Sequence, residues 1–122
     1  MTRQLRALRG ATTVGSNTAA AIAESVQELV QALVERNRLE PDQLLSVTFS
    51  VTADLDACFP AAIARRMPGW DAVALLDCQQ MAVQGDLPRC IRLLAHVWME
   101  PEQAPAHPYL RQAAALRPDR AS

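Results

Sequence analysis

Residues 19–36 carry the strongest periodic pattern in the chain. Their apolar positions recur three or four residues apart and so fall on one side of a helix of about five turns; they are Ile22, Val26, Leu29, Val30 and Leu33. Glutamate and glutamine residues occupy the other side. A turn with N-cap residue types over 15–18 precedes the helix, which ends near Asn37. One apolar stripe of this kind has to be buried against another layer of structure.

The rest of the chain is patterned mainly as short strands. Alternating or continuously apolar segments predict strands over residues 5–14, 45–52, 72–76 and 90–98. Residues 59–67 predict a short helix with Pro60 in its first turn, and residues 109–116 a last short strand or turn. The expected fold class is therefore α+β, a mixed β-sheet with the long amphipathic helix and the short helix on one face. The uncovered face stays apolar, which favours self-association.

Composition bounds the function. With 122 residues the chain forms one domain, 1–122. Its 12 basic and 13 acidic residues give a net charge of −1, which argues against a polybasic binder of nucleic acid or membranes. No apolar run approaches the ~20 residues of a membrane span, and the first residues lack the apolar core of a signal peptide, so we expect a soluble cytoplasmic protein.

The sequence lacks the residues that several kinds of catalytic chemistry require. All 12 basic residues are arginine, so a Schiff-base lysine and a P-loop lysine are excluded. The three cysteines Cys58, Cys78 and Cys90 form no CxxC pair and are expected to be reduced thiols. His96 and His107 lie too far apart in sequence for a paired helical metal site, so no metal site is expected.

Arg92 is the most informative single residue. In the predicted strand it shares a face with Leu94, His96 and Trp98, where a guanidinium needs a polar or anionic partner. That partner is an acidic residue of the protein, water reached by the head of the side chain, or the carboxylate of a ligand.

Three further arginines deserve comparison with Arg92. Arg9 lies in the first strand beside small residues, Arg65 on the short helix and Arg117 near the end of the chain. Each alone is also typical of a solvated surface arginine. All four together would suit a small dianion.

Four separated motifs resemble one family in collinear order. They are residues 6–14 (RALRGATTV), 52–61 (TADLDACFPA), 85–92 (GDLPRCIR), and Tyr109-Leu110 followed by 116–119 (LRPD). The match spans about residues 5 to 119 and resembles the trimeric, AroH-class chorismate mutases.

The resemblance implies a fold, an assembly and a reaction. Members of this family convert chorismate to prephenate by a [3,3] sigmatropic, Claisen-type rearrangement, a step of aromatic amino-acid biosynthesis. They use no cofactor, no metal and no covalent intermediate. Three subunits assemble into a barrel-like homotrimer, and each active site lies between two neighbours. We therefore expect chorismate as the small-molecule substrate, and neither nucleic acid nor a membrane as a partner.

Site residues follow position by position from the same resemblance. Arg92 matches the catalytic arginine beside the breaking ether oxygen, and Arg9 matches an arginine that binds a substrate carboxylate. Tyr109 matches a tyrosine that helps to hold the side-chain carboxylate, and Phe59 an aromatic wall. Arg65 and Arg117 match arginines at the pocket mouth. The segment that lines the pocket around the substrate hydroxyl corresponds to Leu76, Asp77, Cys78, Gln79 and Gln80.

The sequence departs from the family pattern at Gln80. The family usually has a glutamate there, and it commonly has a small residue where this chain has Asp77. Our hypothesis is that Asp77 supplies the missing negative charge while Gln80 keeps a neutral hydrogen bond. That geometry requires a turn, because residues three apart in a regular strand face opposite sides. The other reading makes Asp77 a solvated turn residue.

Other functions remain open from the sequence. The main alternative is a non-catalytic trimer that binds a dicarboxylate as a sensor or regulatory protein. A deaminase-like trimer with interface pockets is more distant. A purely structural oligomer would leave four arginines without a ligand.

Overall fold

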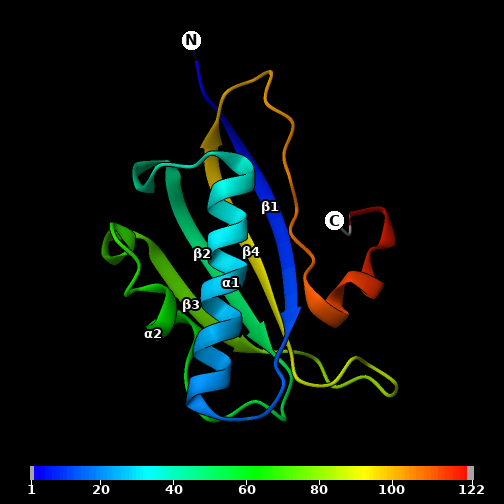
Figure 1. The fold of residues 1–122 in the computed structure, drawn as a ribbon. Coiled ribbons are helices and arrows are strands. Elements are labelled where there is room, and N and C mark those ends of the chain that lie inside the picture. The colour runs from blue at the N-terminus through cyan, green and yellow to red at the C-terminus, as the bar shows by residue number, and fades with distance from the viewer. Residues whose placement is uncertain (1, 121–122) are drawn as a thin grey trace.

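The computed structural model describes residues 2–120 as one sheet with a long helix packed on it (Figure 1). The elements are β1 (Gln4–Thr13), α1 (Ala19–Asn37), β2 (Leu44–Val51), α2 (Pro60–Ala64), β3 (Ala74–Gln79) and β4 (Cys90–Met99). Short 3₁₀ helices cover Pro41–Gln43, Trp70–Ala72, Arg111–Leu116 and Pro118–Arg120. The predicted α+β class is confirmed.

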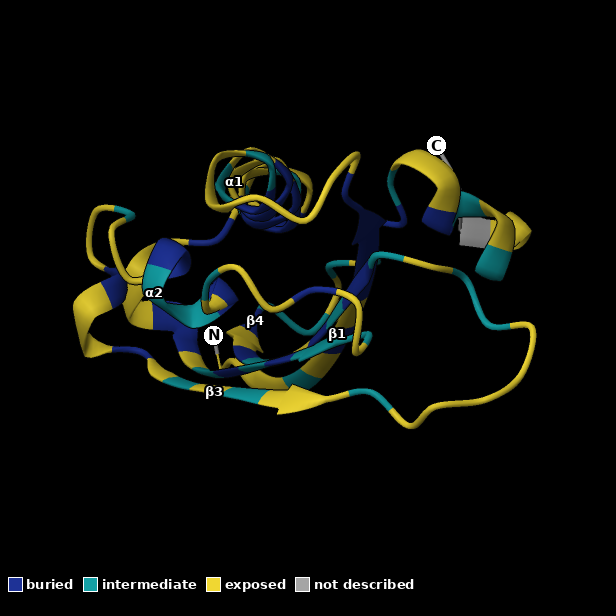
Figure 2. Ribbon diagram, turned by 90° about the horizontal axis from the view of Figure 1, so that it is seen from below, coloured by how far each residue is buried: buried dark blue, intermediate teal, exposed yellow. Residues whose placement is uncertain are grey.

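The four strands form a mixed sheet in the order β1-β4-β2-β3. Strand β4 pairs antiparallel with both β1 and β2, and β3 runs parallel to β2 at one edge. Helix α1 lies across one face of this sheet, and α2 packs on the same side near β3 (Figures 1 and 2). The opposite face has no covering layer within the described chain (Figure 2).

The core lies between α1 and the sheet, as its apolar stripe requires. All five stripe residues, from Ile22 to Leu33, are buried. Their partners on the sheet are buried side chains of the central strands, including Phe49, Ile91 and Val97. Thr18 begins the helix by accepting a hydrogen bond from the Ala21 N–H (3.1 Å), and the chain leaves it through Arg38 in a left-handed conformation.

The other face of the sheet exposes large apolar side chains. In β4, Ile91, Leu93, Ala95 and Val97 are buried, whereas Leu94 and Trp98 on the opposite face are 41% and 38% exposed. Leu76 of β3 and Leu5 of β1 are also exposed. The alternation expected for residues 91–98 is confirmed, and so is the uncovered apolar face.

Three predicted elements differ from the observed ones. The short helix expected over 59–67 is confined to Pro60–Ala64, because the residue before Pro68 is disfavoured in helix and Gly69 takes a positive φ of 81°. The strand expected over 72–76 runs over Ala74–Gln79 instead, because backbone pairing with β2 continues through polar residues. Residues 111–116 form a 3₁₀ helix, since Arg111 turns the chain away at a φ of 52°.

Buried Asn37 joins the end of α1 to the loop that leads towards Tyr109. Its amide nitrogen donates to the carbonyls of Leu33 (2.9 Å) and Ala106 (2.8 Å), and its side-chain oxygen accepts from the Ala106 N–H (2.7 Å). We expect Asn37→Ala to lower the free energy of unfolding by about 2–4 kcal/mol, because three hydrogen bonds are lost and buried backbone groups are left unpaired. Urea denaturation measures this, with the exposed Gln31→Ala as control. A loss no larger than that of the control would contradict the prediction.

Candidate functional site

Two adjoining cavities on the chain share Arg9 and Arg92. One, of about 150 Å³, is lined by these two arginines with Tyr109, Leu116 and Arg117, among others. The second, of about 500 Å³, adds Thr48, Ser50 and Gln80. Five of the predicted site residues therefore line one cation-rich region, which we call the arginine site: Arg9, Gln80, Arg92, Tyr109 and Arg117.

Strand pairing brings the two central arginines together. Arg92 pairs with Ala11 in β1 and with Ser50 in β2, and Arg9 lies two residues along β1 from Ala11. Both arginine side chains consequently belong to the uncovered face of the sheet, opposite α1. The antiparallel register between β1 and β4 thus builds the cationic centre of the site from two distant motifs.

Tyr109 reaches this region because the chain segment before it lies along β1. The Ala11 N–H donates to the Pro108 carbonyl (2.9 Å), and the Leu110 N–H donates to the Ala11 carbonyl (2.8 Å). A Cβ at Gly10 would stand only 2.9 Å from the Pro108 oxygen, so glycine permits this close approach. The residue types at Gly10 and Ala11 therefore determine how near Tyr109 comes to Arg9.

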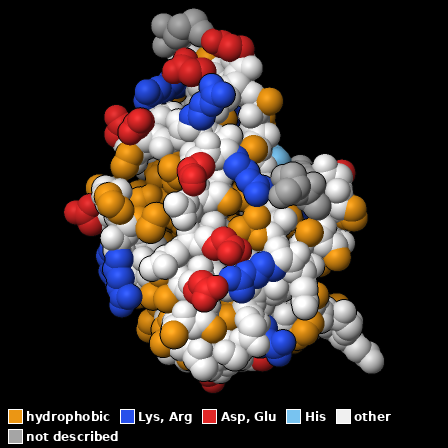
Figure 3. Space-filling model, viewed as in Figure 1, with side chains coloured by type: hydrophobic (Ala, Val, Ile, Leu, Met, Phe, Trp, Pro, Cys, Tyr) orange, Lys and Arg blue, Asp and Glu red, His pale blue; other side chains and the backbone are white. Residues whose placement is uncertain are grey.

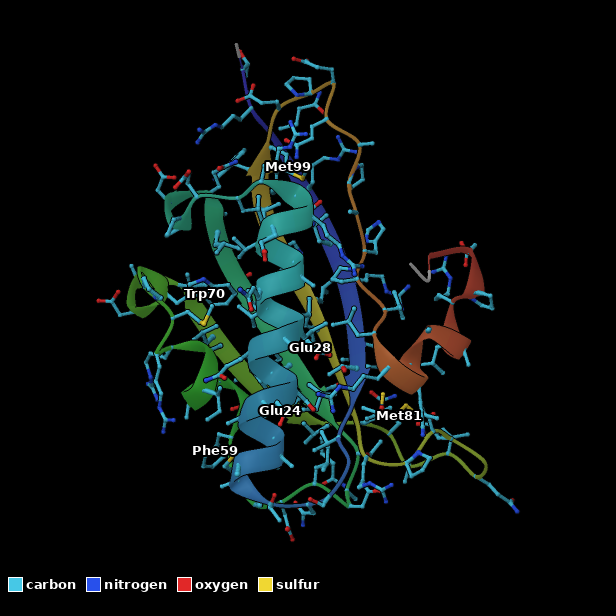
Figure 4. All side chains as sticks on the ribbon, in the orientation of Figure 1. Glu24, Glu28, Phe59, Trp70, Met81 and Met99 are labelled. Atoms are coloured by element: carbon cyan, nitrogen blue, oxygen red, sulfur yellow. The ribbon has the colours of Figure 1, made fainter. Side chains whose placement is uncertain are left out.

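Ion pairs between Arg111 and α1, which we call the Arg111 clamp, hold the segment that follows Tyr109. Arg111 Nε lies 3.1 Å from Glu28 Oε1, and its Nη2 lies 3.2 Å from Glu24 Oε1, both on α1. Figure 3 shows acidic and basic side chains side by side over this helix, and Figure 4 labels both glutamates. The clamp holds the 3₁₀ helix that leads to Arg117, whose Nη2 lies 2.9 Å from Asp119 Oδ2.

Gln80 contributes a neutral group to the arginine site. Its Oε1 accepts a hydrogen bond from the Ser50 hydroxyl (2.9 Å), and its backbone N–H donates to the Val51 carbonyl (2.7 Å). Gln80 follows directly after β3, so it keeps the alternation of that strand and lies beside β2. The hydroxyl of Ser50, which the sequence analysis did not single out, orients it.

Arg92 forms an ion pair with an acidic side chain and also lines a cavity. Its Nη2 lies 3.1 Å from Asp86 Oδ1, and both side chains are mostly buried, at 30% and 21% exposed. The sequence left a choice between an internal ion pair and an open fork for a ligand. The structure combines an internal pair with a lined cavity. Asp86 was missed by sequence reasoning, because nothing in local periodicity marks a loop residue six positions before Arg92 as its partner.

The remaining predicted residues lie in a second region. Phe59, Asp77, Cys78 and Gln79 line a separate cavity of about 650 Å³ beside α2, which we call the α2 pocket. Phe59 is 70% exposed, and Figure 4 shows it well apart from Met81, which is also exposed. Leu76 on β3 and Arg65 at the end of α2 are exposed as well. The predicted site residues thus line two separate cavities on one chain, except Leu76 and Arg65, which line neither of the two.

Asp77 faces α2 rather than Arg92. Its Oδ1 accepts a hydrogen bond from the Ala61 N–H (3.0 Å) at the start of α2. Burial raises the pKa of the Asp77 carboxyl, against the opposing effects of the Ala61 N–H and of Arg65. The turn that the hypothesis required is a strand, so Asp77 and Gln80 point to different sides within one chain. That Asp77 serves the reaction stays a prediction.

Comparison with known proteins places the chain in a family. Residues 5–120 match the family model of chorismate mutase type I. The chain is 36% identical over 116 residues to chorismate mutase AroH of Bacillus subtilis (strain 168), covering 94% of this chain and 91% of that protein. It is 42% identical over 118 residues to chorismate mutase AroH of Thermus thermophilus, covering 94% and 95%.

A solved structure agrees with the sequence relatives. A chorismate mutase from Clostridium thermocellum superposes with a TM-score of 0.84 at 43% identity, covering 90% of this chain and 98% of that one. The cation-rich site on an α+β sheet thus belongs to an enzyme family. This chain is a member of the chorismate mutase type I family.

The described chain has neither a membrane-spanning helix nor a cluster of metal-binding side chains. Within residues 2–120 no helix is long and apolar enough to cross a membrane. The same part of the chain contains no group of three or more His, Cys, Asp or Glu side chains arranged to hold a metal ion.

The environment of Asp77 predicts a pH-dependent stability change. Because burial raises its pKa, the folded wild-type protein loses stability relative to an uncharged variant as the pH rises through that pKa. Asn at position 77 can still accept from the Ala61 N–H. We therefore expect Asp77→Asn to be more stable than wild type at pH 7, with the advantage disappearing below about pH 4.

Urea denaturation at both pH values measures this difference, with Asp71→Asn, an exposed acid, as control. A variant that is less stable than wild type at pH 7 would show that the charged carboxylate stabilises the fold.

Proposed function

We propose that this protein is a chorismate mutase that converts chorismate to prephenate by a [3,3] rearrangement in aromatic amino-acid biosynthesis, acting in the cytoplasm. Membership of the family and the clustering of Arg9, Arg92, Tyr109 and Arg117 around adjoining cavities support this activity. The cluster is the observation that carries the proposal, because a small dianion needs several fixed donors. The non-catalytic, dicarboxylate-binding alternative has no support, since both curated relatives are named as mutases.

Transition-state stabilisation follows from the position of Arg92. In this rearrangement the C–O bond breaks ahead of C–C bond formation, so negative charge gathers on the ether oxygen. A guanidinium fixed beside that oxygen stabilises the transition state more than the ground state. Gln80, oriented by Ser50, adds a neutral amide donor on the same side.

The other donors hold the substrate in its reactive conformation. Arg9 is assigned to a substrate carboxylate, Tyr109 to the side-chain carboxylate, and Arg117 and Arg65 to the ring carboxylate. Holding a flexible dianion in a reactive chair is an orientation effect, for which charge-assisted hydrogen bonds of about 1.5–3 kcal/mol each are sufficient.

A homotrimer completes the proposed site. Each chain carries both the arginine site and the α2 pocket, but the two form separate cavities. The α2 pocket supplies the aromatic wall Phe59 and the segment from Asp77 to Gln79, and the arginine site supplies the cations. When the uncovered sheet faces of three copies meet in a closed barrel, the α2 pocket of one copy can complete the arginine site of its neighbour.

The role of Arg92 predicts a large loss of turnover. We expect Arg92→Ala to lower kcat by roughly 10²–10³ with the fold retained, because one fixed donor at the developing charge is removed. Loss of chorismate absorbance and formation of prephenate measure the rate, and Arg3→Ala, at the exposed ion pair with Glu100 just before β1, is the matched control. An Arg92→Ala variant with the kcat of wild type would refute the mechanism.

The proposed assembly predicts that a charge on the open face separates the subunits. Leu94 is 41% exposed in the chain and lines the larger cavity of the arginine site. We expect Leu94→Arg to give monomers and little turnover, because burying an unpaired charge in a subunit contact is unfavourable. Sedimentation equilibrium measures the mass, and Gln31→Arg on the exposed side of α1 is the control. A Leu94→Arg trimer would contradict this use of the sheet face.

A further inference from the structure

The loop between β3 and β4 presents a carboxylate to Arg92. Asp86 Oδ1 lies 3.1 Å from Arg92 Nη2 and also accepts a hydrogen bond from the Leu87 N–H at 2.8 Å. The Asp86 N–H itself donates to the Val83 carbonyl at 3.1 Å. The carboxylate is therefore held by the backbone of its own loop, and it is only 21% exposed. A surface ion pair between two long flexible side chains lacks such anchoring.

The loop around Asp86 is itself fixed in place. Gly85, immediately before it, has a φ of 83°, a conformation that glycine adopts without strain. Further along, the Arg89 N–H donates to Asp54 Oδ2 (2.9 Å), and Arg89 Nε donates to the Val14 carbonyl (2.9 Å). Asp86 thus meets Arg92 from the loop, where it lines a cavity of about 430 Å³ together with Gln80, while Arg92 lines the arginine site together with Gln80 and Arg9.

Within one chain, neither Gln80 nor Asp77, the two positions considered as sources of the negative charge, forms an ion pair with Arg92. Gln80 is neutral and hydrogen-bonds to Ser50, and Asp77 hydrogen-bonds to the first turn of α2. Among the ion pairs within residues 2–120, the one that Arg92 makes is with Asp86. Within one chain, the negative charge beside Arg92 thus comes from Asp86 in the loop that follows β3.

We propose that Asp86 is the positioning residue of Arg92, holding one terminal nitrogen of the guanidinium so that its other donors face the reacting ether oxygen. A guanidinium carries five N–H groups, so one pairing leaves donors for the substrate. A long arginine side chain has many rotamers, and a fixed carboxylate selects one of them before substrate binds. This assignment rests on the proposed mutase function.

Loss of the Asp86 carboxylate is expected to affect kcat and KM differently, because this group both positions Arg92 and carries a negative charge. Orientation of Arg92 matters most in the transition state, so its loss lowers kcat. A fixed anion beside the site repels a dianionic substrate, so removing that anion does not raise KM and can lower it. Loss of a substrate-binding arginine would instead raise KM. The split between kcat and KM therefore separates positioning from binding.

Steady-state kinetics of three substitutions test the proposal. We expect Asp86→Asn and Asp86→Ala to lower kcat roughly tenfold or more without raising KM, and Asp86→Glu to recover part of the loss because a carboxylate is restored. Glu100→Gln, which removes the exposed partner of Arg3, is the matched control and keeps wild-type kinetics. Urea denaturation and sedimentation show that each variant keeps its fold and assembly.

A second measurement observes Arg92 directly. In wild type the ¹⁵N resonance of the Arg92 Nε is expected to show a restricted guanidinium, and in Asp86→Asn a mobile one. Asp86→Asn with the kcat of wild type, or with a higher KM and unchanged kcat, overturns the positioning role while the mutase function stands. A wild-type protein that does not convert chorismate refutes the proposed function instead. In that case the NMR measurement still tests the ion pair: an Arg92 guanidinium that is equally mobile in wild type and in Asp86→Asn refutes its positioning by Asp86.

Discussion

Strand β4 divides its side chains between two environments, and the rest of the structure depends on that division. On one face, residues such as Ile91, Leu93 and Val97 are buried under α1 and contribute to the core. On the other, Arg92 lies among apolar neighbours on an uncovered face. A shift of the strand by one residue would place the guanidinium in the core, where an unpaired charge is prohibitively unfavourable. The hydrophobic core therefore holds Arg92, the proposed catalytic cation, on the open face.

In the proposed mutase site, Asp86 compensates for the absence of a carboxylate at Gln80. Gln80 brings an amide where the family pattern has a carboxylate, and Ser50 orients that amide. Asp86 brings the charge from the next loop, where backbone hydrogen bonds hold it. A guanidinium between a fixed carboxylate and a cavity is preorganised, because its orientation does not have to be established during the reaction.

The division of the site residues between two cavities has a geometric origin. Parallel pairing at the sheet edge carries β3 and α2 away from β1, so Phe59 and Asp77 cannot share a cavity with Arg9 and Tyr109 in one chain. Meanwhile Gly10 and the clamp between Arg111 and α1 bring the last part of the chain onto β1. Assembly of several chains is the proposed means of joining the two halves.

Local patterns in the sequence were sufficient to predict helix α1, the alternation of side chains in β4 and the uncovered sheet face. These features depend on periodicity within single segments. The motifs also pointed to Arg9, Arg92 and Tyr109, which strand pairing then brought together. Tertiary structure alone decided that β3 extends to Gln79, that Asp77 turns to α2 and that Asp86 meets Arg92. These features depend on which segments become neighbours across a loop or a sheet edge, and side-chain periodicity within a single segment carries no information about such contacts.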